Sequence, residues 1–296
     1  MKHLSAITLL FVNAITTLCF AQEEGPVLYL AESDNARVYI LGGTDAKDMS
    51  WFTDKVESAL NESDALWVEI PPANASLGIP PLRDDVVPSP SSEMHPTAIA
   101  EGYGNLQLGD YLDVAMGERS VVESQRLNLS GGNYSAMQPW LAYYTFYYAF
   151  WPRLELIDPE LELINLARTS GKPVQSLFAD RDEFFRFMGR MNDYAQTHFF
   201  QYLYNTLDWQ RSGDYDSRFT WTTGSPDEQW LEKVRTQTPD YYRYMFQRRN
   251  PVIAEKVAEW LQSNETYFLY IDINRTLGPD SLQQELETLG ISLTPK

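Results

Sequence analysis

The residues best placed to do chemistry follow two apolar segments near opposite ends of the chain. The segment 39–45 ends in Asp45, and the segment 268–278 contains Arg275 shortly before a second glycine. Each segment is typical of a buried strand that leads directly into a glycine-bearing turn. In α/β proteins this arrangement brings reactive groups to the carboxyl edge of the sheet. We therefore expect Asp45 and Arg275 to meet at one edge, which is the candidate functional site.

Carboxylates predicted near this edge would support two kinds of chemistry. Asp45, Asp272 and Glu69 would offer the oxygen ligands that Mg²⁺ or Ca²⁺ requires. Arg275 would oppose such a cation, because its guanidinium stays protonated and has no lone pair to donate. Two acids such as Asp45 and Glu69 would also suit glycoside cleavage, but pairs of acids are too common in sequences to favour that reaction.

Other catalytic residue sets are poorly represented. The chain has three histidines and one cysteine. His95 lies in a proline-rich stretch and His198 in a helical pattern, so a surface or packed position is the expected role of both. The sequence contains neither a Gly-x-Ser-x-Gly turn nor a glycine-rich phosphate loop with a lysine. This disfavours a serine hydrolase and a nucleotide-binding enzyme, and we predict no cofactor.

The first residues have the pattern of a secretory signal. A short basic start at residues 1–3 precedes an apolar stretch at 4–20, and Ala21 offers a small residue for cleavage. We predict a signal peptide at 1–21 and a mature chain of one domain at 22–296. The mature protein is then exported, either to the periplasm or out of the cell, with no stable membrane insertion.

Two other interpretations of this segment are weaker. A lipoprotein would need a small residue before its cysteine, but Leu18 precedes Cys19. An uncleaved anchor would need an apolar run of roughly 18 residues or more, whereas Asn13 interrupts this one. Because Cys19 is the only cysteine, cleavage would leave a mature chain without a disulfide or a thiolate ligand.

The charge of the chain restricts its partners. Lysine and arginine total 23 against 41 aspartates and glutamates, which gives a net charge of −18. Such an excess of negative charge disfavours nucleic acid and anionic lipid as partners. An unidentified small molecule or protein is the expected partner.

The apolar pattern predicts the elements that carry Asp45 and Glu69. Residues 27–30 and 37–41 are expected to form an antiparallel hairpin. A helix follows, and residues 65–70 then form a strand buried on both faces, which is typical of a parallel sheet. From residue 71 to about 104 prolines and small polar residues are frequent, which indicates an irregular insertion.

The middle and the C-terminal part are predicted to be largely helical. The aromatic residues of 139–151 would suit stacking on sugars or bases, but core packing is the preferred interpretation. The further predicted elements are a helix at 159–170, a strand at 174–178 and one long helix from 180 to about 207. With the hairpin, these elements predict an α/β fold in which helices flank a central mixed sheet, with a helix-rich insertion in the middle.

Two later helices have recognisable ends. Asn250 is a candidate N-cap for a helix that starts at Pro251. Asp280 is a candidate N-cap for the last helix, with Gln283 three residues further on and Gly290 as its C-terminal stop.

The chain from about residue 26 to 294 resembles the TraB/GumN (PrgY) family. Members of this family open with a hairpin that ends in Gly-x-x-His and carry a glutamate at the end of the next long strand. Comparable residues occur in the family's order at 37–45, 63–69, 138–140, 167–177, 213–214, 249–250 and 277–280. Each match is weak alone, but together they are specific.

The resemblance implies a metal-dependent hydrolase or protease, as proposed for the related Tiki proteins, with two Gly-x-x-His histidines and the strand glutamate. Here Asp45 stands in the first histidine position and Arg275 in the second. Glu69 remains, and Phe178 replaces another glutamate of the family. An arginine cannot take over the role of a histidine ligand.

These residues define a degenerate candidate site made of Asp45, Glu69, Arg249 and Arg275, with no metal. We predict an ion pair between Asp45 and Arg275 in which the guanidinium replaces the missing cation and Glu69 is a further acceptor. The predicted function is binding or regulation by a protein that has lost the hydrolase activity. The alternative is an active hydrolase or peptidase with a rearranged carboxylate site.

Overall fold

The structure is a computed structural model that describes residues 25–44, 46–72, 108–127, 129, 138–150, 157–212 and 224–296. Several predictions fall outside these residues. They are the signal peptide at 1–21 with Cys19, nearly all of the insertion at 71–104 with His95, and Asp45. Within the described residues, no helix combines the length and apolar character that crossing a membrane demands.

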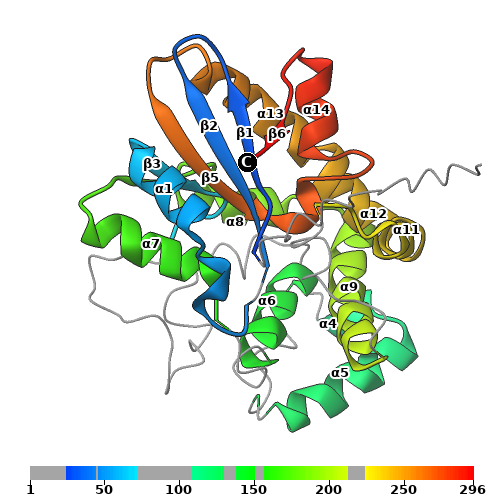
Figure 1. Cartoon of the computed structure of the whole chain (residues 1–296). Helices are drawn as coiled ribbons and strands as arrows, with labels where there is room; N and C mark the ends of the chain where they lie inside the picture. Colours follow the sequence, from blue (N-terminus) through cyan, green and yellow to red (C-terminus); the bar gives the residue numbers. More distant parts are fainter. Residues whose placement is uncertain are drawn as a thin grey trace, which may run out of the picture.

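A mixed sheet of six strands forms the centre of the fold (Figure 1). Its spatial order is β4-β3-β5-β2-β1-β6. The four strands from β4 to β2 are parallel, and β1 and β6 add to the edge in antiparallel pairing. The strands are β1 Leu28–Glu32, β2 Arg37–Gly43, β3 Ala65–Val68, β4 Val174–Ser176, β5 Thr266–Asp272 and β6 Thr294–Pro295.

Strand β5, although late in the chain, lies between β2 and β3. Its parallel pairing with both neighbours aligns the three carboxyl ends. The segments that follow Gly43, Val68 and Asp272 therefore emerge at the same edge of the sheet. This topology explains why the segments 39–45 and 268–278, which are far apart in the sequence, lead to the same edge.

Helices cover both faces of the sheet, as the predicted fold class requires. The alternation of side chains along β1 sends Leu28 and Leu30 to one face and Tyr29 and Ala31 to the other. The first face packs against α1 (Asp54–Glu62) and α7 (Pro159–Thr169). The 3₁₀ turn η1 (Met49–Trp51) comes directly before α1 in the chain. The second face packs against α13 (Arg249–Trp260) and α14 (Leu282–Thr288). The α/β fold with a mixed central sheet is thus confirmed.

A helical part with its own core adjoins the sheet and extends below it in Figure 1. The aromatic residues of α6 that the structure describes belong to this core, and Trp140 and Phe146 are fully buried. This agrees with core packing as the role of that segment. The helices are α4 Leu108–Tyr111, α5 Val114–Arg126, α6 Pro139–Phe150, α8 Arg181–Gly189, α9 Asp193–Ser212, α11 Glu228–Gln237 and α12 Pro239–Tyr242.

The prediction of one long helix from 180 to about 207 is wrong. The structure has two helices there, α8 and α9, with a break at residues 190–192. Asn192 causes the new start, because its side-chain oxygen accepts a hydrogen bond from the N–H of Ala195 at 2.8 Å. Gly189 ends α8, and the apolar pattern continues across the break because Met191 is buried between the two helices.

Both predicted N-caps near the C-terminus are also wrong. Asn250 lies inside α13, because the five-residue π-helix η5 (Arg243–Gln247) leads into α13 and leaves no free helix start at that point. The side chain of Asn250 instead donates to the carbonyl of Asp280 at 2.6 Å. The cap of α14 is Ser281, one residue later than predicted, and it accepts from the N–H of Gln284 at 3.2 Å.

Candidate functional site

Two glycines at the end of β2 allow close packing of the neighbouring chain: Gly42 leaves room for the turn that carries Arg275, and Gly43 leaves room for Tyr270 of β5. A Cβ atom at Gly42 would lie 2.5 Å from Ile273, and one at Gly43 would lie 1.8 Å from the ring of Tyr270. Neither position accepts a larger residue without displacement of these neighbours. The 3₁₀ turn η6 (Ile273–Arg275) therefore packs directly on the carboxyl end of β2, and Arg275 turns into the protein with 5% of its side chain exposed.

Glu69 receives two arginines at this edge. It follows the last residue of β3, and its Oε1 lies 3.2 Å from Nη2 of Arg275 and 3.5 Å from Nε of Arg249. All three side chains are largely buried, with 14% of Glu69 and 7% of Arg249 exposed. Two permanent positive charges thus share one carboxylate. The three side chains form a buried ion-pair cluster with charge-assisted hydrogen bonds and little contact with water.

The π-helix η5 supplies a further acceptor for Arg275. The backbone carbonyl of Met245, in the middle of η5, accepts a hydrogen bond from Nη1 of Arg275. A π-helical turn interrupts the usual backbone pairing, and such turns occur frequently at functional sites. Arg275 is therefore held from two sides, by Glu69 of the sheet edge and by Met245 of the helical part.

Arg249 is held by a flat aromatic surface as well as by Glu69. Its Cζ lies 3.9 Å from the ring centroid of Phe178 and 5.7 Å from that of Phe187. Burial lowers the pKa of Arg249, although Glu69 counteracts this effect and an arginine remains charged in any case. Within the part of the chain that the structure describes, Nη2 of Arg249 has no hydrogen-bond partner.

Two acids at the start of α7 belong to the same region and were not predicted. Asp158 caps α7 by accepting the N–H of Glu160 at 2.9 Å. Burial raises the pKa of Glu160 to about 8, with further contributions from the charges of Asp158 and Glu69. Their only sequence signal is the cap pattern Asp-Pro-Glu, which by itself indicates a helix start.

The remaining predicted residues are placed as follows. Asp45 lies outside the described residues, so its predicted pairing with Arg275 stays a prediction. Asp272 is exposed, and its carboxylate accepts the N–H of Asn274 at 2.8 Å, which caps η6. The structure thus brings Glu69, Arg249 and Arg275 together, with Glu160 added from α7.

The residues described here do not fit a transition-metal site of the kind that the resemblance implies. Within the described residues, Glu69 is the carboxylate that forms ion pairs with both arginines, and a guanidinium cannot ligate a metal. A cation near Glu69 would also be repelled by two fixed positive charges at a distance of a few ångströms. No reaction step is therefore assigned to a metal in this cluster.

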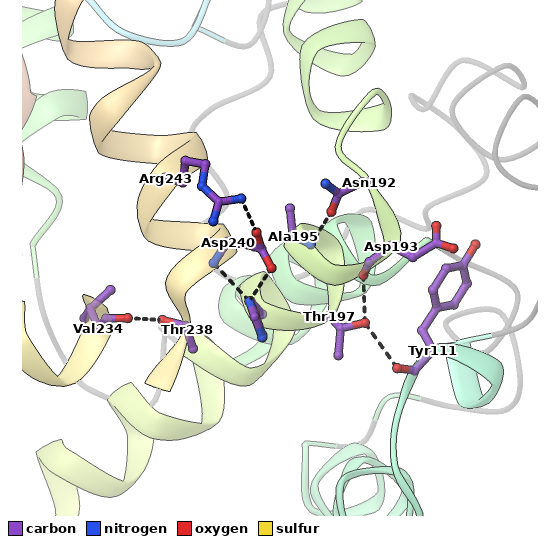
Figure 2. A network of polar contacts seen from close by, with 10 residues as sticks. Tyr111, Asn192, Asp193, Ala195, Thr197, Val234, Thr238, Asp240 and Arg243 are labelled. Atoms are coloured by element: carbon purple, nitrogen blue, oxygen red, sulfur yellow. Dashed lines mark hydrogen bonds and ion pairs between the residues drawn. The ribbon is translucent and has the colours of Figure 1, made fainter. Parts of the chain in front are cut away.

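His198 belongs to a different network in the helical part, together with Asp240 and Arg243, which Figure 2 labels. Its Nδ1 accepts a hydrogen bond from the backbone N–H of Asp240 at 3.1 Å and lies 3.5 Å from that residue's carboxylate. Arg243 donates to the other carboxylate oxygen of Asp240 at 2.6 Å. The histidine thereby completes the start of α12, which agrees with the packed role expected for it.

The comparisons with known proteins give one match. The model of the TraB/PrgY/gumN family matches residues 27–295, which is nearly the whole chain. No curated protein and no solved structure matches. The match includes the strands that end at Gly43, Val68 and Asp272 and therefore the whole candidate site. The chain belongs to the TraB/PrgY/gumN family.

Proposed function

We propose that this protein is an exported member of its family that binds a ligand and has lost the family's metal-dependent hydrolase activity. Export rests on the signal pattern at residues 1–21. The loss of activity rests on the residues at the two histidine positions, which are Asp45 and Arg275. The role that remains for the site is recognition of a small molecule or protein.

The ion pair of Arg275 with Glu69 is the observation that carries this proposal. The guanidinium lies 3.2 Å from the glutamate that the resemblance assigns to the metal site. It supplies the positive charge that a metal ion would supply, but it offers neither a Lewis acid nor an activated water. The guanidinium neutralises the buried carboxylate of Glu69, so this edge of the sheet can remain stable without a bound metal ion.

Peptidase and metal assays on the purified mature protein test this proposal. We expect no chelator-sensitive cleavage of a mixed peptide library, because the site lacks neutral imidazole ligands for zinc, manganese or cobalt. Glu69→Gln is the matched control, since it removes the glutamate while keeping its size. Cleavage that a chelator stops and that Glu69→Gln abolishes would overturn the proposal.

One observation favours the alternative of an active hydrolase with a carboxylate site. The charge of Glu69 contributes to the raised pKa of Glu160, which burial and Asp158 bring to about 8. A protonated acid beside an ionised one is the arrangement that general acid and base catalysis uses. This alternative predicts chelator-insensitive hydrolysis that Glu160→Gln abolishes, and our proposal predicts none.

A further inference from the structure

Strand β6 covers only part of the edge of β1. The ladder between the two strands ends with the pair of Leu30 and Thr294, and the N–H of Lys296 donates to the carbonyl of Leu28 at 2.8 Å. In an antiparallel ladder every second residue of a strand bonds toward the same neighbour. The backbone groups of Leu28, Leu30 and Glu32 therefore all point toward the β6 side. Glu32 is the next position of this edge after the end of the ladder.

The backbone of Glu32 lacks a partner on this side. Its neighbour Ser33 bonds in the opposite direction, because its N–H donates to the carbonyl of Ala36 at 2.9 Å. The register would place Ser292 opposite Glu32, but the two residues do not pair. Among the described residues, neither the N–H nor the carbonyl of Glu32 takes part in a hydrogen bond. One donor and one acceptor are thus left unpaired, next to each other, at the sheet edge.

A pocket opens at this position, where the last turn of α13 and the segment between α14 and β6 meet the end of β1. It has a volume of about 510 Å³, and both Glu32 and Ser292 line it. Its apolar lining residues are Leu30, Ala258, Leu261, Leu289 and Ile291. Glu32 is the one charged side chain among the described residues that line it, and it lies 4.0 Å from Arg37. The pocket thus combines an apolar wall with an unpaired backbone position.

The pocket is separate from the candidate site. Glu32 pairs with Arg37, the first residue of β2, whereas the site lies beyond Gly43, the last residue of that strand. A strand of this length spans roughly 20 Å. Figure 1 shows β6 and α14 beside β1, at the side of the sheet away from β3. A short segment bound in the pocket therefore leaves the ion pairs of Glu69 untouched.

We propose that this pocket binds an extended, uncharged segment of a partner protein, which continues the sheet beside β1 where β6 stops. The segment residue opposite Glu32 donates its N–H to the carbonyl of Glu32 and accepts the N–H of Glu32. Because side chains alternate along a strand, the two flanking residues direct apolar side chains toward Leu261 and Ile291. Main-chain bonds supply affinity in this mode of binding, and the apolar wall supplies specificity. The inference goes beyond the proposed function, because it concerns a second surface.

Three blocked tripeptides test the inference. Acetyl-Leu-Ala-Leu-amide has both apolar side chains and a free central N–H, and we expect a dissociation constant on the order of millimolar, as befits so few atoms. An analogue methylated at the alanine nitrogen keeps the side chains but cannot donate to Glu32. Acetyl-Gly-Ala-Gly-amide keeps the backbone without the apolar side chains. Each analogue should bind at least about tenfold more weakly. Titration calorimetry of the mature protein measures all three.

Two variants locate the binding. Gln262→Trp fills the pocket from an exposed position after α13 and should weaken binding of acetyl-Leu-Ala-Leu-amide at least about tenfold. Glu32→Pro should have a similar effect, because it removes an N–H that the fold itself does not use, at a sheet edge where proline is tolerated. Gln175→Trp is the matched control, since Gln175 is exposed on β4 at the opposite edge of the sheet. This control should bind the tripeptide like the unchanged protein.

Four results would overturn the inference. They are no binding of acetyl-Leu-Ala-Leu-amide, equal binding of its N-methylated analogue, equal binding by Gln262→Trp, and a dimer of the unchanged protein that Gln262→Trp dissociates. Sedimentation detects the last result, which would assign the pocket to a second copy of this chain. None of these results bears on the loss of hydrolase activity, which the chelator-sensitive peptidase assay tests separately.

Discussion

Two clusters in this protein have a similar arrangement of one acidic and two basic side chains but differ in burial. In each, one carboxylate lies between two basic side chains: Glu69 with Arg249 and Arg275 at the sheet edge, and Asp240 with His198 and Arg243 in the helical part (Figure 2). At the sheet edge the side chains are 5 to 14% exposed. In the helical part Asp240 is 19% and Arg243 is 54% exposed.

The difference in burial predicts how strongly each cluster contributes to the stability of its region. Water screens the pair of Arg243 with Asp240, so its contribution to stability is small. At the sheet edge little water is available, and each charge needs its partners for the fold to tolerate it. In the proposed function the edge cluster excludes a metal ion, whereas the helical cluster completes the start of α12.

Breaking the buried cluster should have the largest effect on stability. Arg275→Met leaves Glu69 with the more distant Arg249 alone and leaves the carbonyl of Met245 without its donor. We expect the free energy of unfolding to fall by roughly 3 kcal/mol or more. The double variant Arg275→Met with Glu69→Met should lose clearly less than the sum of the two single changes. Urea denaturation measures all three variants.

The exposed cluster supplies the matched control for this prediction. Arg243→Met removes the same side chain from a pair of only 2.6 Å. We expect a loss below about 1 kcal/mol, because solvent replaces most of what the ion pair contributes. Equal losses for Arg243→Met and Arg275→Met would show that burial does not separate the two clusters.

An intermediate effect is expected from Glu160, which extends the edge cluster. Its pKa is about 8 in the folded protein and 4.5 in the reference state. The folded state therefore holds an extra proton between these values, and stability falls as the pH rises from 4.5 to 8. Because Glu160 retains some solvent contact, we expect a fall of about 2 kcal/mol that Glu160→Gln removes. Denaturation curves at pH 5 and pH 8 test this. The same pH dependence of the unfolding free energy in Glu160→Gln as in the unchanged protein would contradict it.

The smallest effect is expected from His198. Burial lowers its pKa, while the charge of Asp240 acts in the opposite direction. The unfolded state then takes up the proton first, so stability falls as the pH decreases below the ordinary value of 6.5. Protonation of Nδ1 would also cost the hydrogen bond from Asp240, about 1 kcal/mol or less. A comparison of His198→Gln with the unchanged protein between pH 7 and pH 5 should show a shallower dependence in the variant.

The strands were easier to predict than the helix ends. Near-continuous apolar runs locate β1, β2 and β5, because these strands are buried on both faces of the sheet. The break between α8 and α9 was missed because the apolar pattern continues through Met191. The start of α13 was misplaced because a π-helix precedes it, and no local composition signals such a turn.

The candidate site was predictable where its residues follow strands, and Arg249 of α13 was predictable only through the family resemblance. Glu69 and Arg275 follow β3 and β5 directly, so their positions derive from the strand pattern. The carbonyl of Met245 and the carboxylate of Glu160 come from helices whose position depends on tertiary packing. A sequence pattern carries no signal for a backbone carbonyl that a π-helix turns toward an arginine.

The central claim is that Arg275 takes the place of a catalytic cation at Glu69, and metal binding tests it most directly. Equilibrium dialysis of the mature protein against Zn²⁺, Mn²⁺ and Co²⁺, followed by elemental analysis, gives the metal bound per chain. The account predicts clearly less than one equivalent of each metal, and the same amount in Glu69→Gln. One equivalent of any of these metals in the unchanged protein, lost in Glu69→Gln, would contradict it.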